Sequence, residues 1–187
     1  MRFAVIPTGN RPDDYANVVK WCEDHDTTVI TIATSQEAES YAKGEVIVSH
    51  DFNIQKWWNL GIDRATKLGA TTIAILNDDA IMPDDWFDFI EPRLVDHSGA
   101  SGLRFGTHAK ISGYAFALNA NDGIRADERF VWWYGDDDIE QQCRNKRGFL
   151  IIPGFEVGNK YANSSAPMMR KQIRRDRWSY QNKWGIR

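Results

Sequence analysis

The sequence predicts an α/β fold in which a mostly parallel central sheet is covered by helices on both faces. Short apolar or β-branched runs alternate along the chain with longer segments whose apolar residues have helical spacing, an order typical of β–α units. A length of 187 residues suits one domain, and 42% hydrophobic against 26% charged residues is ordinary for a globular protein. We therefore expect a single α/β domain.

Four strands are expected in the first half of the chain, because four short runs are apolar or rich in β-branched residues. These runs are residues 3–8, 27–34, 44–50 and 71–76. Between the first two, a helix is expected from Pro12, since proline suits a first helical turn and apolar residues follow at helical spacing. A second helix is expected over 53–69, with Gly69 as its C-terminal cap.

The second half continues the alternation. Residues 83–97 predict a short helix that is interrupted before Pro92, because proline cannot donate a helical hydrogen bond. Residues 101–105 and 112–119 read as strands, and a turn is expected at 119–123. Residues 127–148 pass through an acidic cluster into a helix that ends near Gly148, and a last strand follows from Phe149.

The net charge of −3 conceals an uneven distribution. Residues 166–187 contain seven Lys or Arg against one Asp, which gives this tail a charge of +6 and leaves −9 for the rest of the chain. Such a tail either meets an anion, or is a solvated helix face, or docks on the acidic body. We expect a catalytic domain over 1–158 and a basic tail over 159–187 that could serve as a lid or an acceptor-side segment.

Several kinds of site are disfavoured by missing patterns. The sequence has no GxxxxGK loop, no GxGxxG after the first strand and no GxSxG elbow, and its four His and two Cys lack the spacing of zinc ligands. No apolar run approaches the roughly 20 residues that span a bilayer. Cys22 and Cys143 lie far apart in helix-like segments, which argues against a disulfide and suits a reducing cytoplasm.

The carboxyl ends of the predicted strands carry polar residues. The stretches PTGNR, ATSQ and NDD follow the strands at 3–8, 27–34 and 71–76, and ligands of open α/β sheets bind at this edge. Asp78 and Asp79 would repel each other unless a cation lies beside them. A hard divalent cation, Mg²⁺ or Mn²⁺, suits such carboxylates together with phosphate oxygens. Alternatively, the two acids begin a turn before the next helix.

Five motifs occur in the order seen in family-2 glycosyltransferases of the GT-A fold. They are VIPTGNRP, NLGIDRA, ILNDDAIMP, SGYAFALN and WWYGDDDIEQQCRNKRG, and the closing YQNKWG resembles the C-terminal ending of many members. The resemblance covers about residues 3–150. It implies a GT-A fold, a nucleoside-diphosphate-sugar donor, with a UDP-sugar slightly favoured, and a Mn²⁺ or Mg²⁺ cofactor.

The resemblance also implies roles for residues on the donor side. Asp79 is the expected metal ligand of a DxD-type motif whose first position is Asn77. Asn159 stands where many relatives have a metal-binding His, so either Asn159 or a water would complete the coordination. The residues expected to contact the nucleotide are Pro7, Thr8, Arg11, Ala33, Thr34, Asn59, Asn77 and Asp78.

The segment YGDDDIEQQCR resembles the E-D-x-D-L-x-x-R segment that carries the catalytic base of the family. Counting back from Arg144 places Asp137 on its Glu and Asp138 on the following Asp, the expected base. Alternatively, the adjacent acids only cap a helix N-terminus. Trp132 and Trp133 precede this helix and could stack on a sugar or fill the core.

The predicted activity is inverting, metal-dependent transfer of a sugar to an acceptor hydroxyl. The acceptor could be a glycan, a lipid-linked glycan, a protein or another hydroxyl compound. Nucleic acid is expected as a partner only if it is the acceptor. A homo-oligomer could complete a small acceptor site. One alternative is a non-catalytic nucleotide-sugar or glycan-binding module on the same core. Another is nucleotidyl transfer to a sugar phosphate, although PTGNRPDD has a single Gly and a single Arg where that chemistry usually has a glycine-rich basic loop.

Overall fold

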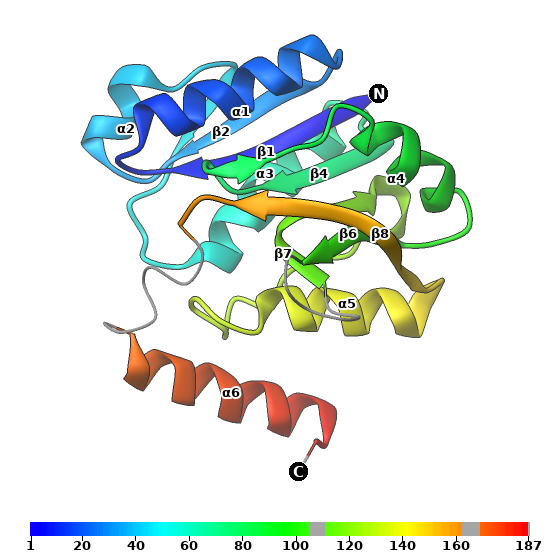
Figure 1. The fold of residues 1–187 in the computed structure, drawn as a ribbon. Coiled ribbons are helices and arrows are strands. Elements are labelled where there is room, and N and C mark those ends of the chain that lie inside the picture. The colour runs from blue at the N-terminus through cyan, green and yellow to red at the C-terminus, as the bar shows by residue number, and fades with distance from the viewer. Residues whose placement is uncertain (105–110, 162–168, 187) are drawn as a thin grey trace.

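A computed structural model describes residues 1–104, 111–161 and 169–186 as one α/β domain (Figure 1). The strands are β1 (Arg2–Thr8), β2 (Thr28–Ala33), β3 (Glu45–Val48), β4 (Thr72–Leu76), β5 (Ala80–Ile81), β6 (Gly99–Arg104), β7 (Ile111–Asn119) and β8 (Phe149–Asn159). The helices are α1 (Pro12–Asp24), α2 (Gln36–Tyr41), α3 (Ile54–Lys67), α4 (Trp86–Leu94), α5 (Gly135–Lys146) and α6 (Arg170–Trp184), with a short 3₁₀ turn at Ala120–Asp122.

The strands form one mixed sheet in the order β3-β2-β1-β4-β7-β6-β8-β5. Strands β3, β2, β1 and β4 are mutually parallel, and so are β6 and β8. The pairs β4–β7, β6–β7 and β5–β8 are antiparallel. The predicted α/β class is confirmed, and the parallel arrangement holds for the half of the sheet where β1, β2 and β4 end side by side.

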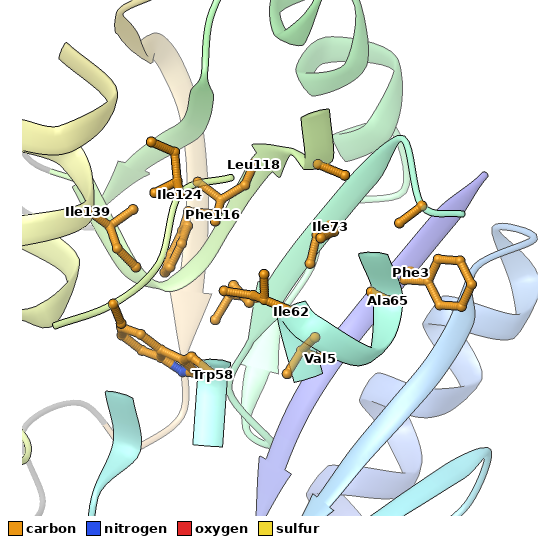
Figure 2. Close-up of a cluster of buried hydrophobic side chains, with 14 of the residues drawn as sticks. Phe3, Val5, Trp58, Ile62, Ala65, Ile73, Phe116, Leu118, Ile124 and Ile139 are labelled. Atoms are coloured by element: carbon orange, nitrogen blue, oxygen red, sulfur yellow. The ribbon is translucent and has the colours of Figure 1, made fainter. Parts of the chain in front are cut away.

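Both faces of the sheet are covered, because successive residues of each buried strand point to opposite sides. Phe3 and Val5 belong to the cluster shown in Figure 2, which packs α3 and α5 against the sheet. Ala4 and Ile6 belong to a second cluster on the other face, beneath α1 and α4. The near-continuous apolar runs of β1 and β4 follow from this two-sided burial.

Most expected elements are found close to their predicted limits, and α4 differs. The sequence predicts an interruption before Pro92, but α4 continues through Pro92 to Leu94. Trp86, Phe87 and Ile90 are fully or almost fully buried from this helix. Their burial holds the helical turn in place although Pro92 cannot donate to the carbonyl one turn earlier.

Two helices were not predicted. Helix α2 is short, and its N-cap is Ser35, whose side chain accepts a hydrogen bond of 3.1 Å from the Ala38 amide. Helix α6 occupies the middle of the basic tail and lies beside α5 (Figure 1). Of the alternatives for the tail, docking on the body is the one observed, through the buried carboxylate of Asp176. Phe105, the last residue of the strand predicted at 101–105, lies outside the described residues. So do residues 106–110, and residues 162–168 and Arg187 of the tail.

Two further expectations concern the thiols and the membrane. Cys22 and Cys143 are both buried free thiols, and burial raises the pKa of each to about 12. Among the helices of the described residues, none combines the length and the apolar character that crossing a bilayer requires.

Candidate functional site

A pocket of about 450 Å³ lies at the carboxyl ends of β1, β2 and β4. These strands are parallel, so the polar residues that follow each of them meet at one edge of the sheet. Residues from the start of β7, the end of β8 and the N-terminus of α5 complete the walls. The predicted site residues that line the pocket are Pro7, Thr8, Arg11, Thr34, Asn77, Asp78, Asp79 and Asn159.

Four predicted site residues are not part of the pocket wall: Ala33, Asn59, Asp137 and Asp138. Ala33 is fully buried in β2, and its neighbour Thr34 provides this wall instead. Asn59 holds the backbone of Ala126 through two 2.9 Å hydrogen bonds, so its amide supports a loop rather than facing the pocket.

Arg11 lies between the two adjacent carboxylates of the NDD stretch. Its Nη1 is 2.9 Å from Oδ2 of Asp79 and 3.5 Å from Oδ1 of Asp78. Asp79 is almost fully buried, with 1% of its side chain exposed. A cation beside the pair therefore offsets the repulsion that the sequence implied, and the cation in this structure is a guanidinium.

Asp78 is held in a partly desolvated position. Thr8 donates a hydrogen bond of 2.9 Å to its carboxylate. Burial raises the pKa of Asp78 to about 6, against the opposing effects of the Thr8 hydrogen bond and the Arg11 charge. A raised carboxyl pKa in a pocket is typical of functional sites, because burial disfavours the charged carboxylate and a bound cation would offset that cost.

Asn159 and Tyr161 orient Asp79 from the end of β8. The Asn159 amide nitrogen donates to Oδ1 of Asp79 at 3.0 Å, and the Tyr161 backbone N–H donates to Oδ2 at 3.0 Å. The Arg11 guanidinium also lies over the Tyr161 ring, 4.6 Å from its centroid. Asn159 therefore presents a donor, not an oxygen, toward the expected metal ligand.

The opposite wall is aromatic and carries one carboxylate, Asp136. Trp132 and Trp133 line the pocket, and the Trp132 ring stacks on Phe52 with 4.9 Å between ring centroids. Asp136, in the first turn of α5, lies against Gly113 of β7, where a Cβ would collide with its carboxylate. A side chain at position 113 would therefore displace the Asp136 carboxylate from its present position.

Asp138, the expected catalytic base, lies behind this wall. Its carboxylate is fully buried and accepts hydrogen bonds from Trp184 Nε1 at 2.9 Å and Gln142 Nε2 at 2.7 Å. Lys183 Nζ is 2.7 Å from the same carboxylate. These donors come from α5 and α6, so Asp138 ties the two helices together, while Asp136 occupies the position at the pocket.

Asp176 of α6 holds the aromatic wall by its backbone. Its two carboxylate oxygens accept hydrogen bonds from the N–H groups of Val131, Trp132 and Trp133 at 2.9–3.1 Å. Asp176 is fully buried, and Gln172 donates to it at 2.7 Å. One side chain thus satisfies three successive backbone donors just before α5 begins.

The basic side chains of α6 do not line the pocket formed by the described residues. Arg177 donates to the Tyr134 hydroxyl at 2.8 Å, and Lys183 pairs with Asp127 and Asp138. Arg174 and Arg175 line a separate groove between α6 and the segment that carries Arg129 and Val131. These basic side chains therefore do not reach the residues of the pocket in this arrangement.

Sequence reasoning missed Asp136 because it took the register of the acidic cluster from Arg144. A different signal was present. Consecutive helical residues point about 100° apart, and Ile139 and Cys143 mark the buried face of α5. Asp136 precedes Ile139 by three residues and Cys143 by seven, so it lies near the face that these two residues mark, whereas Asp138 points about 100° away from Ile139.

No protein-family model matches the chain, and no curated protein matches it by sequence. Solved structures do resemble it. S. aureus TarS 1–349 superposes with a TM-score of 0.62 at 9% identity, over 94% of this chain and 65% of that one. The chain therefore spans just under two thirds of that protein, which was also solved with UDP and with UDP-GlcNAc.

Two other neighbours resemble the chain over similar stretches. The catalytic domain of Drosophila beta1,4galactosyltransferase 7 has a TM-score of 0.60 at 11% identity, over 87% of this chain and 71% of that one. A protein from Bacillus anthracis that is described as a glucose-1-phosphate thymidylyltransferase has a TM-score of 0.58 at 11% identity, over 96% of this chain and 95% of that one. The chain has the GT-A fold. At these identities, the likeness is one of fold.

Proposed function

We propose that the protein is an inverting, metal-dependent glycosyltransferase that uses a nucleoside-diphosphate sugar. The observation that carries this proposal is the arrangement of the pocket. Asp78, Asp79 and Arg11 form its polar end at the tips of β1 and β4, and Asp136 with two Trp residues forms the opposite wall. The structures of S. aureus TarS with UDP and UDP-GlcNAc support a UDP-sugar as donor.

On the donor side, Asp78 and Asp79 would hold Mn²⁺ or Mg²⁺. The residues fit such a cation, because a guanidinium already lies between the carboxylates and a hard divalent cation takes one or two carboxylates plus phosphate oxygens. When bound, the metal would stabilise negative charge on the leaving diphosphate. Asn159 would orient Asp79, and could act as a ligand only after its amide turned to present oxygen. In the described residues no cluster of three or more His, Cys, Asp or Glu side chains forms a metal site by itself.

On the acceptor side, we assign the general base to Asp136 rather than to Asp138. Asp136 would accept the proton of the acceptor hydroxyl while that oxygen attacks the anomeric carbon. The bond between this carbon and the diphosphate oxygen breaks with its electron pair on the diphosphate, and attack from the opposite face inverts the anomeric configuration. Trp132 and Trp133 would pack against the sugar rings.

The three adjacent acids of α5 provide a matched test of this assignment. Asp136→Asn, Asp137→Asn and Asp138→Asn each remove one charge from the same helical turn. We expect Asp136→Asn to lower UDP release from UDP-GlcNAc by about 100-fold or more while the thermal shift caused by UDP is unchanged. Asp137→Asn should keep the activity. Normal turnover by Asp136→Asn would overturn the assignment.

A nucleotide screen tests the donor class. The melting temperature is measured with UDP, GDP, dTDP and CMP, each with and without Mn²⁺. Ligand binding to the native state at a hundredfold excess over Kd stabilises by about 2.7 kcal/mol, so a donor nucleotide will be visible. A shift that needs Mn²⁺ supports the metal proposal. The absence of any shift would favour a non-catalytic module that does not bind nucleotide.

A second candidate function is nucleotidyl transfer to a sugar phosphate. The observation that favours it is the coverage of 95% of the Bacillus anthracis thymidylyltransferase-like chain. The two reactions have different products. Incubation with UTP or dTTP and glucose 1-phosphate releases pyrophosphate only if the second function is correct.

A further inference from the structure

A groove with a volume of about 510 Å³ lies between α6 and the segment that carries Arg129 and Val131. Its wall includes Arg129, Val131, Gln172, Arg174, Arg175 and Trp178. Arg174 and Arg175 precede Trp178 by four and three residues, so all three occupy one face of the helix. Trp178 is 69% exposed, which is unusual because tryptophan residues are highly buried on average.

The charge of this surface is strongly positive. Helix α6 has six basic residues and one acidic residue, Asp176, whose charge is directed inward to three backbone N–H groups. Arg174 and Arg175 are exposed. A planar ring flanked by guanidinium groups is suited to a ligand that offers both a flat face and negative charge.

The groove is continuous in sequence with the wall of the pocket. Val131 lines the groove, and the next two residues, Trp132 and Trp133, line the pocket. The backbone of all three is held by the same carboxylate, Asp176. The groove and the pocket therefore share one stretch of backbone in their walls, which places the groove near the pocket.

We propose that this groove binds an acidic oligosaccharide portion of the acceptor. The inference rests on the proposed glycosyltransferase function and names the class of its acceptor. Such a chain supplies a hydroxyl group for the pocket, ring faces for Trp178 and carboxylate or phosphate groups for Arg174 and Arg175. Indole faces pack well on the apolar face of a sugar ring, and arginine binds planar anions in two-point geometry.

Two other occupants fit the surface less well. A membrane would need an apolar helix face, whereas the large apolar side chains exposed near α6 in the described residues are Trp178 and Ile186. Nucleic acid would extend beyond the groove over a body that carries −9 outside residues 166–187, which opposes a long polyanion. A short acidic glycan needs only the charges of the groove.

The test measures binding of defined probes by calorimetry at low salt. The acidic probes are a hyaluronan tetrasaccharide and a heparin tetrasaccharide, the neutral probe is a chitin tetrasaccharide, and an eight-nucleotide oligothymidylate represents nucleic acid. We expect an acidic tetrasaccharide to bind the wild-type protein. Arg174→Ala/Arg175→Ala and Trp178→Ala should each raise its Kd at least tenfold.

The matched control is Arg170→Ala/Lys171→Ala, which removes the same charge from the same helix outside the groove. It should raise Kd less than threefold. The proposal is overturned if neither acidic probe binds, if the neutral probe binds equally well, if the control loses as much affinity, or if the oligothymidylate binds more tightly through the same residues.

The thermal shift with UDP, measured on the same variants, separates this inference from the proposed function. A UDP shift together with no tetrasaccharide binding refutes the groove alone. Tetrasaccharide binding without a shift by any nucleotide refutes the donor proposal and leaves a glycan-binding surface.

Discussion

The Trp184 indole nitrogen donates a hydrogen bond of 2.9 Å to the fully buried carboxylate of Asp138, 46 residues earlier in the chain. Lys183 reaches the same carboxylate at 2.7 Å. The KWG ending therefore meets the acidic cluster of α5 directly, although it is remote in sequence and does not line the pocket. Because Asp138 and Asp136 share one helical turn, this contact fixes the position of the candidate base.

Trp184→Phe should lower the free energy of unfolding by about 2 kcal/mol, because phenylalanine keeps an aromatic ring at this position but loses the hydrogen bond to a buried charged group. Urea unfolding measures this change. Trp178→Phe is the control, since its side chain is 69% exposed and surface substitutions usually change stability by less than about 0.5 kcal/mol. Equal losses in both variants would contradict a role for the Asp138 contact.

Asp176→Ala should destabilise the protein by about 3 kcal/mol, because three backbone N–H groups lose their acceptor in a buried setting. The substitution should also lower turnover, since the same backbone carries Trp132 and Trp133. Asn182→Ala, an exposed change in the same helix, serves as the reference in urea unfolding. A native-like stability of Asp176→Ala would show that α6 is not needed to hold this wall.

The stability of the wild-type protein should depend on pH through Asp78. Burial raises its pKa to about 6 from an ordinary value of 3.8, so the folded state holds the proton more tightly than the unfolded state. The resulting stability is fully present below about pH 4 and is lost as pH rises through 6, a contribution of about 2–3 kcal/mol at roughly 1.4 kcal/mol per pKa unit. Asp78→Asn lacks this titration, so its stability relative to the wild type should increase between pH 4 and pH 7. A constant difference between the two proteins across that range would refute the shifted pKa.

Arg11→Gln leaves Asp78 and Asp79 without their guanidinium. We expect the free energy of unfolding at pH 7 to fall by about 2 kcal/mol, because two buried carboxylates then lie side by side without a cation. Mn²⁺ should recover more stability in this variant than in the wild type. Lys20→Gln, which breaks an exposed pair with Asp24, is the control. If Mn²⁺ has the same effect on all three proteins, the carboxylates are not its site.

Periodicity and turn chemistry were sufficient to predict most of the sheet and the long helices. The buried face of α3 could be predicted from Trp58 and Ile62, because an amphipathic helix must bury its apolar stripe. Helix α6 could not be predicted in this way. It buries Asp176 rather than an apolar stripe, and the three backbone N–H groups that donate to this carboxylate lie more than 40 residues away.

The strand-end side of the pocket was easier to predict than the side formed by α5, for a related reason. Thr8 ends β1, Asp78 and Asp79 follow β4, and parallel strands end at one edge of the sheet. Asn59 and Asp138 were assigned by motif register, and their side chains turn to Ala126 and Trp184 instead. Which acid of a helical turn faces a pocket depends on the tertiary contacts of that turn.

The polar docking of α6 has a consequence for motion. A helix held mainly by contacts of the two buried carboxylates Asp176 and Asp138 is a natural unit of partial unfolding, able to detach while the sheet stays intact. The amide protons of Val131, Trp132 and Trp133 would then exchange with solvent together and faster than those of β1. Their exchange rate would report how often the aromatic wall of the pocket loses its shape, independently of whether the end of the pocket at Asp78 and Asp79 is formed.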